Sequence, residues 1–208
     1  MAARLASIGH DVLAGSREKS RAESVVAALR EKWDTRVDGL RAGTNEDAAG
    51  ADDLVIVATT WEGAVETAAA HAEALAGKVV VSMANGLEKV GREFRPVLPE
   101  AGSLAQAVQV AAPAARVVSA FHLIPAAAFG ALDEEMGSDV VVCGDDDDAR
   151  AQVRDLVSTI PNLGAFDGGS LANSVGLEAF TAVLLTVNLR HHGSATLRLS
   201  GVDRLPPR

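Results

Sequence analysis

The strongest constraint on the fold is the alternation of short segments rich in valine, isoleucine and alanine with segments of helical spacing. Within 18–33, small or apolar residues recur at the spacing of one helix face. Residues 53–59 form a continuous apolar run, as expected of a strand covered on both faces. The alternation predicts an α/β fold with a doubly wound, mostly parallel sheet. The predicted strands are 11–15, 53–59, 78–82, 116–121, 139–143 and 162–167.

Three further helices are expected, and they determine where ligands would bind. One begins near Trp61, runs for about fifteen residues and ends with Gly77 as its C-cap. The others are 149–160 and a long, mostly apolar helix over 171–190. In parallel sheets of this type, ligands bind beyond the carboxyl ends of the strands. The loops to inspect are therefore 15–17, 58–61, 82–87 and 121–128.

Charge and cysteine content exclude several classes of partner. The 19 basic and 28 acidic residues give a formal net charge of -9, which argues against nucleic acid or an anionic membrane as the main partner. The single cysteine, Cys143, permits no disulfide within the chain and is expected to be inert core. Polar residues, among them Glu178, interrupt the helix over 171–190, so we expect it to cover another subunit or domain rather than to cross a membrane. A cytoplasmic location is expected.

Residues 145–148 are four consecutive aspartates, which two interpretations fit. One is a metal or calcium loop. The other is the N-cap and first turn of the helix over 149–160, where carboxylates favour the positive end of the helix dipole. The run lacks the alternating ligands and glycine of a calcium loop, so we favour the helix cap and expect no metal site.

The beginning of the sequence departs from the usual order of a Rossmann-type dinucleotide-binding fold. That fold opens with a strand and a glycine-rich turn, followed by a helix whose N-terminus holds the pyrophosphate. Residues 1–11 instead resemble that helix, followed by a glycine and the next strand. No G-x-G-x-x-G precedes them. We therefore expect a sheet that lacks its first strand and glycine-rich turn, through a late start or a truncation, and weak NADP binding by this chain.

The residues after the strand over 11–15 indicate which nicotinamide cofactor would bind. In enzymes whose cofactor has no 2′-phosphate, an acidic residue at this position accepts a hydrogen bond from the ribose 2′-hydroxyl. In enzymes that bind a 2′-phosphate, arginine and hydroxyl side chains donate to it instead. This chain has Ser16 and Arg17, with no acid before Glu18. The other interpretation is a polar turn in which Ser16 caps the next helix. Within this order of elements we favour a site for NADP.

Four blocks, taken in order, carry a resemblance to a known family. They are LASIGHDVLAGSR at 5–17, NEDAA at 45–49, SAFHLIPA at 119–126 and VCGDDD at 142–147. Together they resemble the NADPH-dependent reductases of coenzyme F420, which is an 8-hydroxy-5-deazaflavin. The resemblance extends over nearly the whole chain, and the block at 119–126 is its most specific part.

The resemblance implies an oxidoreductase that transfers a hydride between NADP(H) and F420. The two cofactors would carry the electrons, so no catalytic side chain is expected from the protein. It further implies a cofactor-binding domain over 1–168, and a helical segment over 169–208 that contributes to the deazaflavin site and to a homodimer or larger homo-oligomer. The loop 83–88 departs from the proline-containing loop of the archaeal-type members. The cofactor-binding residues are expected to be Ser16, Arg17, Arg21, Thr59, Thr60, Trp61, Ala84, Asn85, His122, Ile124, Pro125 and Leu197.

Two alternative functions remain open from the sequence. One is a pyrroline-5-carboxylate or imine reductase-like NADP enzyme. Those relatives carry a long helical dimer domain, whereas about 40 residues follow the last predicted strand here. The other is a catalytically dead remnant whose phosphate-binding turn is gone.

Overall fold

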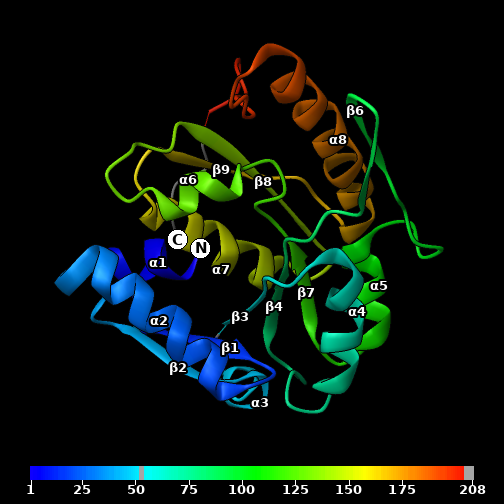
Figure 1. The fold of residues 1–208 in the computed structure, drawn as a ribbon. Helices are drawn as coiled ribbons and strands as arrows, with labels where there is room; N and C mark the ends of the chain where they lie inside the picture. The colour runs from blue at the N-terminus through cyan, green and yellow to red at the C-terminus, as the bar shows by residue number, and fades with distance from the viewer. Residues whose placement is uncertain (52–53, 204–208) are drawn as a thin grey trace.

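The computed structural model describes residues 1–51 and 54–203, and its helices and strands alternate along most of the chain (Figure 1). Short 3-10 turns occur at Asp34–Val37 and Leu171–Asn173. The helices are α1 (Ala2–Ser7), α2 (Lys19–Trp33), α3 (Asn45–Ala49), α4 (Trp61–Ala70), α5 (Leu104–Ala111), α6 (Ala126–Gly130), α7 (Asp147–Thr159) and α8 (Ser174–His191). The strands are β1 (Val12–Ser16), β2 (Leu40–Thr44), β3 (Leu54–Val57), β4 (Val79–Ser82), β5 (Leu87–Val90), β6 (Glu93–Pro96), β7 (Arg116–Ser119), β8 (Ser138–Gly144) and β9 (Leu163–Asp167).

The sheet is mostly parallel, as the sequence predicts. Five strands pair in the order β3-β4-β7-β8-β9, and only the β7–β8 pair among them is antiparallel. β1 and β2 form a separate parallel pair, and β5 and β6 form an antiparallel hairpin. The fold is therefore the α/β type with helices on both faces that was expected.

Helices cover the two faces of the central strands in separate layers. On β4, Val79 and Val81 pack into one apolar cluster with residues of α1 and α7, whereas Val80 packs into a second cluster with residues of α4 and α5. The side chains alternate in this way because successive residues of a strand point to opposite faces. A strand buried on both faces favours apolar residues at successive positions, which explains the run Val79–Val81.

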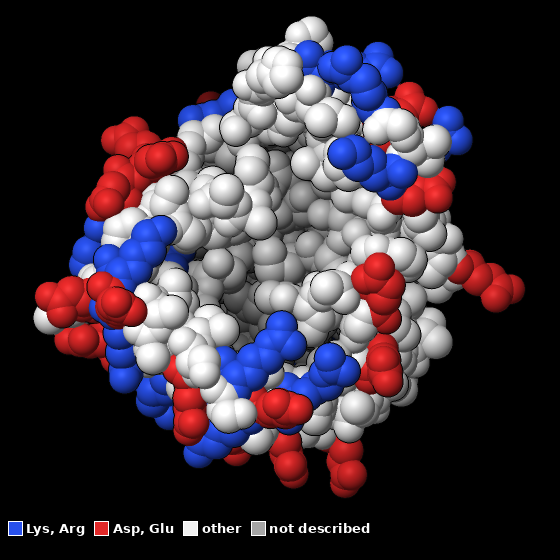
Figure 2. Space-filling model, viewed as in Figure 1, with Lys and Arg blue, Asp and Glu red and all other residues white. Residues whose placement is uncertain are grey.

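The parallel sheet is interrupted between β1 and β3. Among the described strands, β1 pairs only with β2 and β3 pairs only with β4. Val12 of β1 and Leu54 and Ile56 of β3 nevertheless pack, partly buried, against the same apolar cluster. In the space-filling view a hollow lies in the middle of the molecule (Figure 2). The β1–β2 pair and the five-stranded sheet thus share one apolar cluster, although no described strand pairs them with each other.

Several element boundaries differ from the predicted ones. The helix that begins at Trp61 ends at Ala70, and a turn follows it, so Gly77 with φ +74 is not its C-cap. The strand predicted to reach Phe121 ends at Ser119, because Phe121 takes a φ of +67 that no strand allows. Sequence patterns also missed β2, the β5–β6 hairpin, α5 and the short helix α6.

Candidate functional site

The loops that follow β4 and β7 meet at the carboxyl ends of these neighbouring parallel strands. The Asn85 side chain donates from Nδ2 to the backbone oxygen of His122, at 3.1 Å. The Nδ1 atom of His122 lies 3.0 Å from Oδ1 of Asn85, and its Nε2 atom lies 2.8 Å from the hydroxyl of Ser119. Thr181 of α8 donates its hydroxyl to Asn85 Oδ1 at 3.1 Å. Two loops and the last helix are thus joined at one point.

His122 lies inside this network with only 5% of its surface exposed. Burial lowers the pKa of His122 to about 4, against an opposing contribution from a backbone hydrogen bond at Ala84. The ring is therefore neutral at physiological pH. Since both ring nitrogens have hydrogen-bond partners, His122 is suited to shaping a site rather than to proton transfer.

The segment after β7 forms a buried, mostly apolar wall. Phe121 has a positive φ of 67, and its ring packs edge to face on Phe129 at 5.8 Å between centroids. A bulky residue in this conformation is strained, and such strain collects at functional sites. Ile124 is buried in the core, and Pro125 is the N-cap residue of α6. The sequence-predicted residues at 122, 124 and 125 thus lie on one short, fixed segment.

The loop after β1 carries exposed basic side chains. Ser16 ends β1 half-buried, whereas Arg17 and Arg21 are exposed. Within the described residues the structure gives neither arginine an ion pair. The N-cap of α2, Glu18, makes no side-chain cap hydrogen bond. Lys and Arg side chains also lie on the lower rim of the hollow in Figure 2. An anionic group would find unpaired cations here.

The loop after β3 presents hydroxyl groups to solvent. Thr59 and Thr60 are exposed, and Thr60 is the N-cap residue of α4 without a side-chain cap hydrogen bond. Trp61 is half-buried and packs against the cluster beneath α4 and α5. The Thr59 hydroxyl donates to the backbone oxygen of Thr60 at 3.2 Å, whereas the exposed Thr60 hydroxyl is not used as a helix cap at the end of β3.

Two further predicted residues lie at the margin of the network. Ala84 is buried beside Asn85. Leu197 reaches the start of β8, where its backbone oxygen accepts a hydrogen bond from the amide of Asp139 at 2.8 Å. Asp139 also lines a small cavity together with His122. The structure therefore places Leu197 beside β8 and outside the hydrogen bonds of the network.

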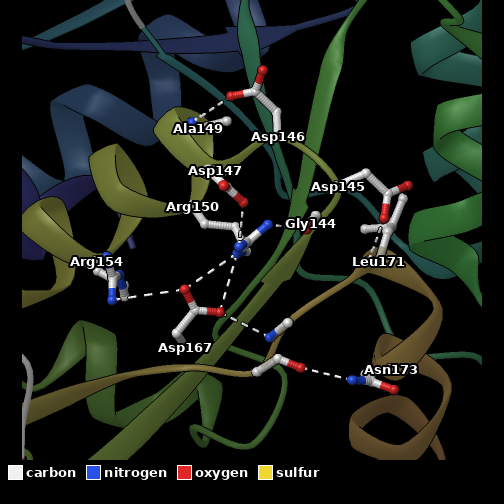
Figure 3. A network of polar contacts seen from close by, with 12 residues as sticks. Gly144, Asp145, Asp146, Asp147, Ala149, Arg150, Arg154, Asp167, Leu171 and Asn173 are labelled. Atoms are coloured by element: carbon white, nitrogen blue, oxygen red, sulfur yellow. Dashed lines mark hydrogen bonds and ion pairs between the residues drawn. The ribbon is translucent and has the colours of Figure 1, made fainter.

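The aspartates at 145–148 serve the fold, as the helix-cap interpretation predicts (Figure 3). Asp146 is the N-cap of α7 and accepts from the amide of Ala149 at 2.7 Å. Asp145 accepts from the amide of Leu171, and Asp147 pairs with Arg150. Among the described residues there is no group of three or more His, Cys, Asp or Glu side chains placed to hold a metal ion.

Helix α8 is attached to the rest of the molecule through a buried carboxylate. Glu178 is 2% exposed and accepts from the amides of Leu104 and Ala105, at 2.7 and 3.1 Å. These amides belong to the first turn of α5, so Glu178 caps that helix from outside. Beside it, the hydroxyls of Ser103 and Ser174 lie 2.8 Å apart. Sequence analysis noted Glu178 only as an interruption of an apolar helix.

The opposite side of α8 borders an open apolar groove. The groove has a volume of about 730 Å³ and lies between β6 and α8. Phe180, Val183 and Val187 line it and are 41%, 52% and 39% exposed. By length and hydropathy alone the segment Leu171–His191 could span a membrane, although such a helix also occurs in soluble proteins. Its hydrogen bonds to α5 and β6 show that it packs against the rest of the chain.

Comparison with known proteins gives consistent results. The model of a family described as NADP oxidoreductase coenzyme F420-dependent matches residues 1–86. The F420-dependent NADP reductase of Methanocaldococcus jannaschii is 33% identical over 210 residues, which cover 98% of this chain and 93% of that protein. The crystal structure of a protein from Arthrobacter sp. FB24, provisionally described as an F420-dependent NADP reductase, matches with a TM-score of 0.78 at 26% identity, covering 93% of this chain and 90% of that one.

A more distant likeness concerns one of the alternative functions. An imine reductase of Streptomyces aurantiacus matches with a TM-score of 0.55 at 20% identity, covering 91% of this chain and 57% of that one. At this identity the likeness shows a shared fold only. The reductase relatives, by contrast, match in sequence over nearly the whole chain.

Proposed function

This chain belongs to the family of coenzyme F420-dependent NADP oxidoreductases, and we propose that it transfers a hydride between NADP(H) and F420. The observation that carries this proposal is the 33% identity to an F420-dependent NADP reductase over 98% of the chain. The geometry supports the proposal. The loop with the unpaired cations follows β1, and the buried apolar wall follows β7, so both lie at the carboxyl ends of strands. Ligands bind at such carboxyl ends.

We assign the NADP side of the site to the loops after β1 and β3. Ser16 and Arg17, helped by Arg21, would bind the 2′-phosphate, because their side chains supply hydrogen-bond donors and positive charge. The loop has no acidic residue before Glu18 at the position that selects cofactors without this phosphate. Thr59, Thr60 and Trp61 would lie along the cofactor. This assignment predicts a preference for NADPH over NADH.

The deazaflavin side is assigned to Ala84, Asn85, His122, Ile124, Pro125 and Leu197. The nicotinamide and the deazaflavin supply the hydride chemistry when both are bound. The protein's task is to align the donor and acceptor carbons, and a buried wall held by hydrogen bonds suits that task. Since His122 is neutral with both ring nitrogens engaged, we assign no catalytic acid or base to the chain.

Turnover with defined substrates tests the function. NADPH should be oxidised when F420 is the acceptor, and no oxidation should occur with pyrroline-5-carboxylate or a cyclic imine in its place. The reverse pattern would transfer the assignment to the imine reductase group. Failure of all three acceptors, with the protein folded by circular dichroism, would favour a catalytically inactive remnant.

We further propose that residues 1–168 form the NADP-binding part and that 169–208 contribute to the deazaflavin site and to subunit contacts. The exposed apolar residues of α8 support the second assignment. We place the protein in the cytoplasm, where its single cysteine stays reduced. Burial raises the pKa of the Cys143 thiol to about 11, so it is unreactive there.

The apolar groove along α8 predicts a homo-oligomer. Sedimentation at micromolar concentration should show a dimer or larger species, and Val183→Asp should shift it to the monomer, because a charge on the contact face is costly to bury. Val25→Asp is the matched control, since Val25 of α2 is similarly exposed at 50% and lies outside the groove. A stable wild-type monomer would contradict this prediction.

A further inference from the structure

We propose that Asn85 and Thr181 are positioning residues that hold His122 in a single neutral form, protonated at Nδ1, and thereby fix the wall on which the deazaflavin packs. This inference rests on the proposed function for its second half only. The state of His122 itself is a property of the protein without cofactors. It can therefore be measured independently of any reaction.

The hydrogen bonds of Asn85 determine where the proton of His122 lies. The Asn85 amide nitrogen donates to the backbone oxygen of His122, which orients the amide so that its oxygen faces Nδ1 of the ring. A carbonyl oxygen can only accept, so Nδ1 must carry the hydrogen. Nε2 is then an acceptor, and the buried hydroxyl of Ser119 at 2.8 Å is its donor. Only one neutral tautomer satisfies both of these side-chain contacts.

Thr181 connects this arrangement to α8. Its hydroxyl lies 3.1 Å from Oδ1 of Asn85, 3.3 Å from the backbone oxygen of His122 and 3.0 Å from that of Leu177. One hydroxyl hydrogen is thus shared among three acceptors, all of which face Thr181. A displacement of α8 would break the contact to both loops at once. The rotation of α8 and the orientation of the His122 ring are therefore coupled.

The surroundings of His122 contain no charged hydrogen-bond partner within the described residues. Asp139 of β8 lines the same small cavity, but its carboxylate accepts from the amide of Leu199 and pairs with Arg198. Glu178 of α8 is turned toward the first turn of α5. Ser119, Asn85 and Thr181 are all uncharged. The backbone hydrogen bond at Ala84 favours the imidazolium form, but burial outweighs it, so the ring stays neutral over the working pH range.

Nitrogen NMR of the imidazole in the cofactor-free protein tests the first half of the proposal. The His122 signals, assigned by their loss in His122→Gln, should show hydrogen on Nδ1 and no titration between about pH 5 and 8. In Asn85→Asp the new carboxylate should raise the pKa of His122 by about 1–3 and bring it toward the physiological range. Gln152→Glu on α7 makes the same change of charge outside the network and should leave the His122 signals unmoved.

Kinetics tests the second half. Thr181→Val removes the hydroxyl without changing the side-chain shape, and should raise KM for F420 or lower kcat about tenfold through loss of alignment, at any pH. Thr181→Ser should restore most of the activity. Asn85→Asp should make the rate dependent on pH where the wild-type rate is flat.

Two results would overturn the proposal. One is a wild-type His122 that carries its hydrogen on Nε2 or titrates above about pH 6. The other is a normal rate and pH profile in both Thr181→Val and Asn85→Asp. If the NMR result holds but no variant or wild-type protein turns over F420, then the assigned reaction fails while the tautomer assignment stands.

Discussion

Replacement of Glu178 by alanine is expected to lower the free energy of unfolding by about 3–5 kcal/mol. The carboxylate receives the amides of Leu104 and Ala105, and it is only 2% exposed. Removing it leaves two buried donors without a partner and the positive end of α5 without its counter-charge. The same change removes one attachment of α8, the helix that also carries Thr181. Denaturant titration of the free energy of unfolding measures the effect.

Two variants calibrate this prediction. Glu178→Gln keeps one oxygen acceptor in place and should lose less stability than alanine. Glu62→Ala, at an exposed position in the first turn of α4, should change the free energy of unfolding little. A loss below about 1 kcal/mol in Glu178→Ala would show that Glu178 does not hold α8 in place.

The pH dependence of this effect has a definite sign. Burial raises the pKa of Glu178, although the amides of Leu104 and Ala105 oppose the change. A carboxyl whose pKa is higher in the folded state contributes most below its unfolded value of about 4.5, and the contribution falls as pH rises through the folded value. The stability advantage of the wild type over Glu178→Gln should therefore shrink from acidic to neutral pH.

Arg17→Ala is expected to lower kcat/KM for NADPH roughly 10- to 150-fold. This factor corresponds to the loss of about 1.5–3 kcal/mol of transition-state stabilisation. The guanidinium is exposed, and the described structure provides no ion pair for it, so its charge is available to a phosphate. NADH lacks the 2′-phosphate, and its kcat/KM should hardly change. The ratio of the two values, from steady-state kinetics, is the measured quantity.

A second exposed arginine provides the control for this measurement. Arg92, in the turn between β5 and β6, is also exposed and belongs to a different strand pair. Arg92→Ala should leave the NADPH/NADH ratio unchanged. An unchanged ratio in Arg17→Ala as well would mean that another group binds the 2′-phosphate, and the assignment of Ser16 and Arg17 would be wrong.

The fold was largely predictable because its signals are local. Valine-rich runs give the buried strands β4, β7 and β8, and the helical spacing of 18–33 gives α2. The missed β2 contains Arg41 and Gly43 and lacks an apolar run, and it forms because its backbone pairs with β1. Its strand character comes from tertiary pairing, which a single segment does not reveal.

The site was predictable only in part, since its contacts join residues far apart in the chain. The resemblance indicated Asn85 and His122, but it did not show that their side chains meet. Thr181 and Glu178 were not predicted as site or anchor residues. Polar residues three apart in an apolar helix are the one signal that could have indicated them, because buried polar groups require partners. Which partners they have depends on how α8 packs against α5 and the two loops.

The most direct test of the assigned reaction follows one hydrogen atom. NADPH carrying deuterium at the transferred position of its nicotinamide is mixed with the protein and F420 in ordinary water, and the reduced deazaflavin is examined by mass spectrometry. The account predicts that the deuterium arrives in the deazaflavin, because the hydride passes directly between the two cofactors without a protein acid or base. Reduced deazaflavin that carries only hydrogen from water, or NADPH that is never consumed, would contradict it.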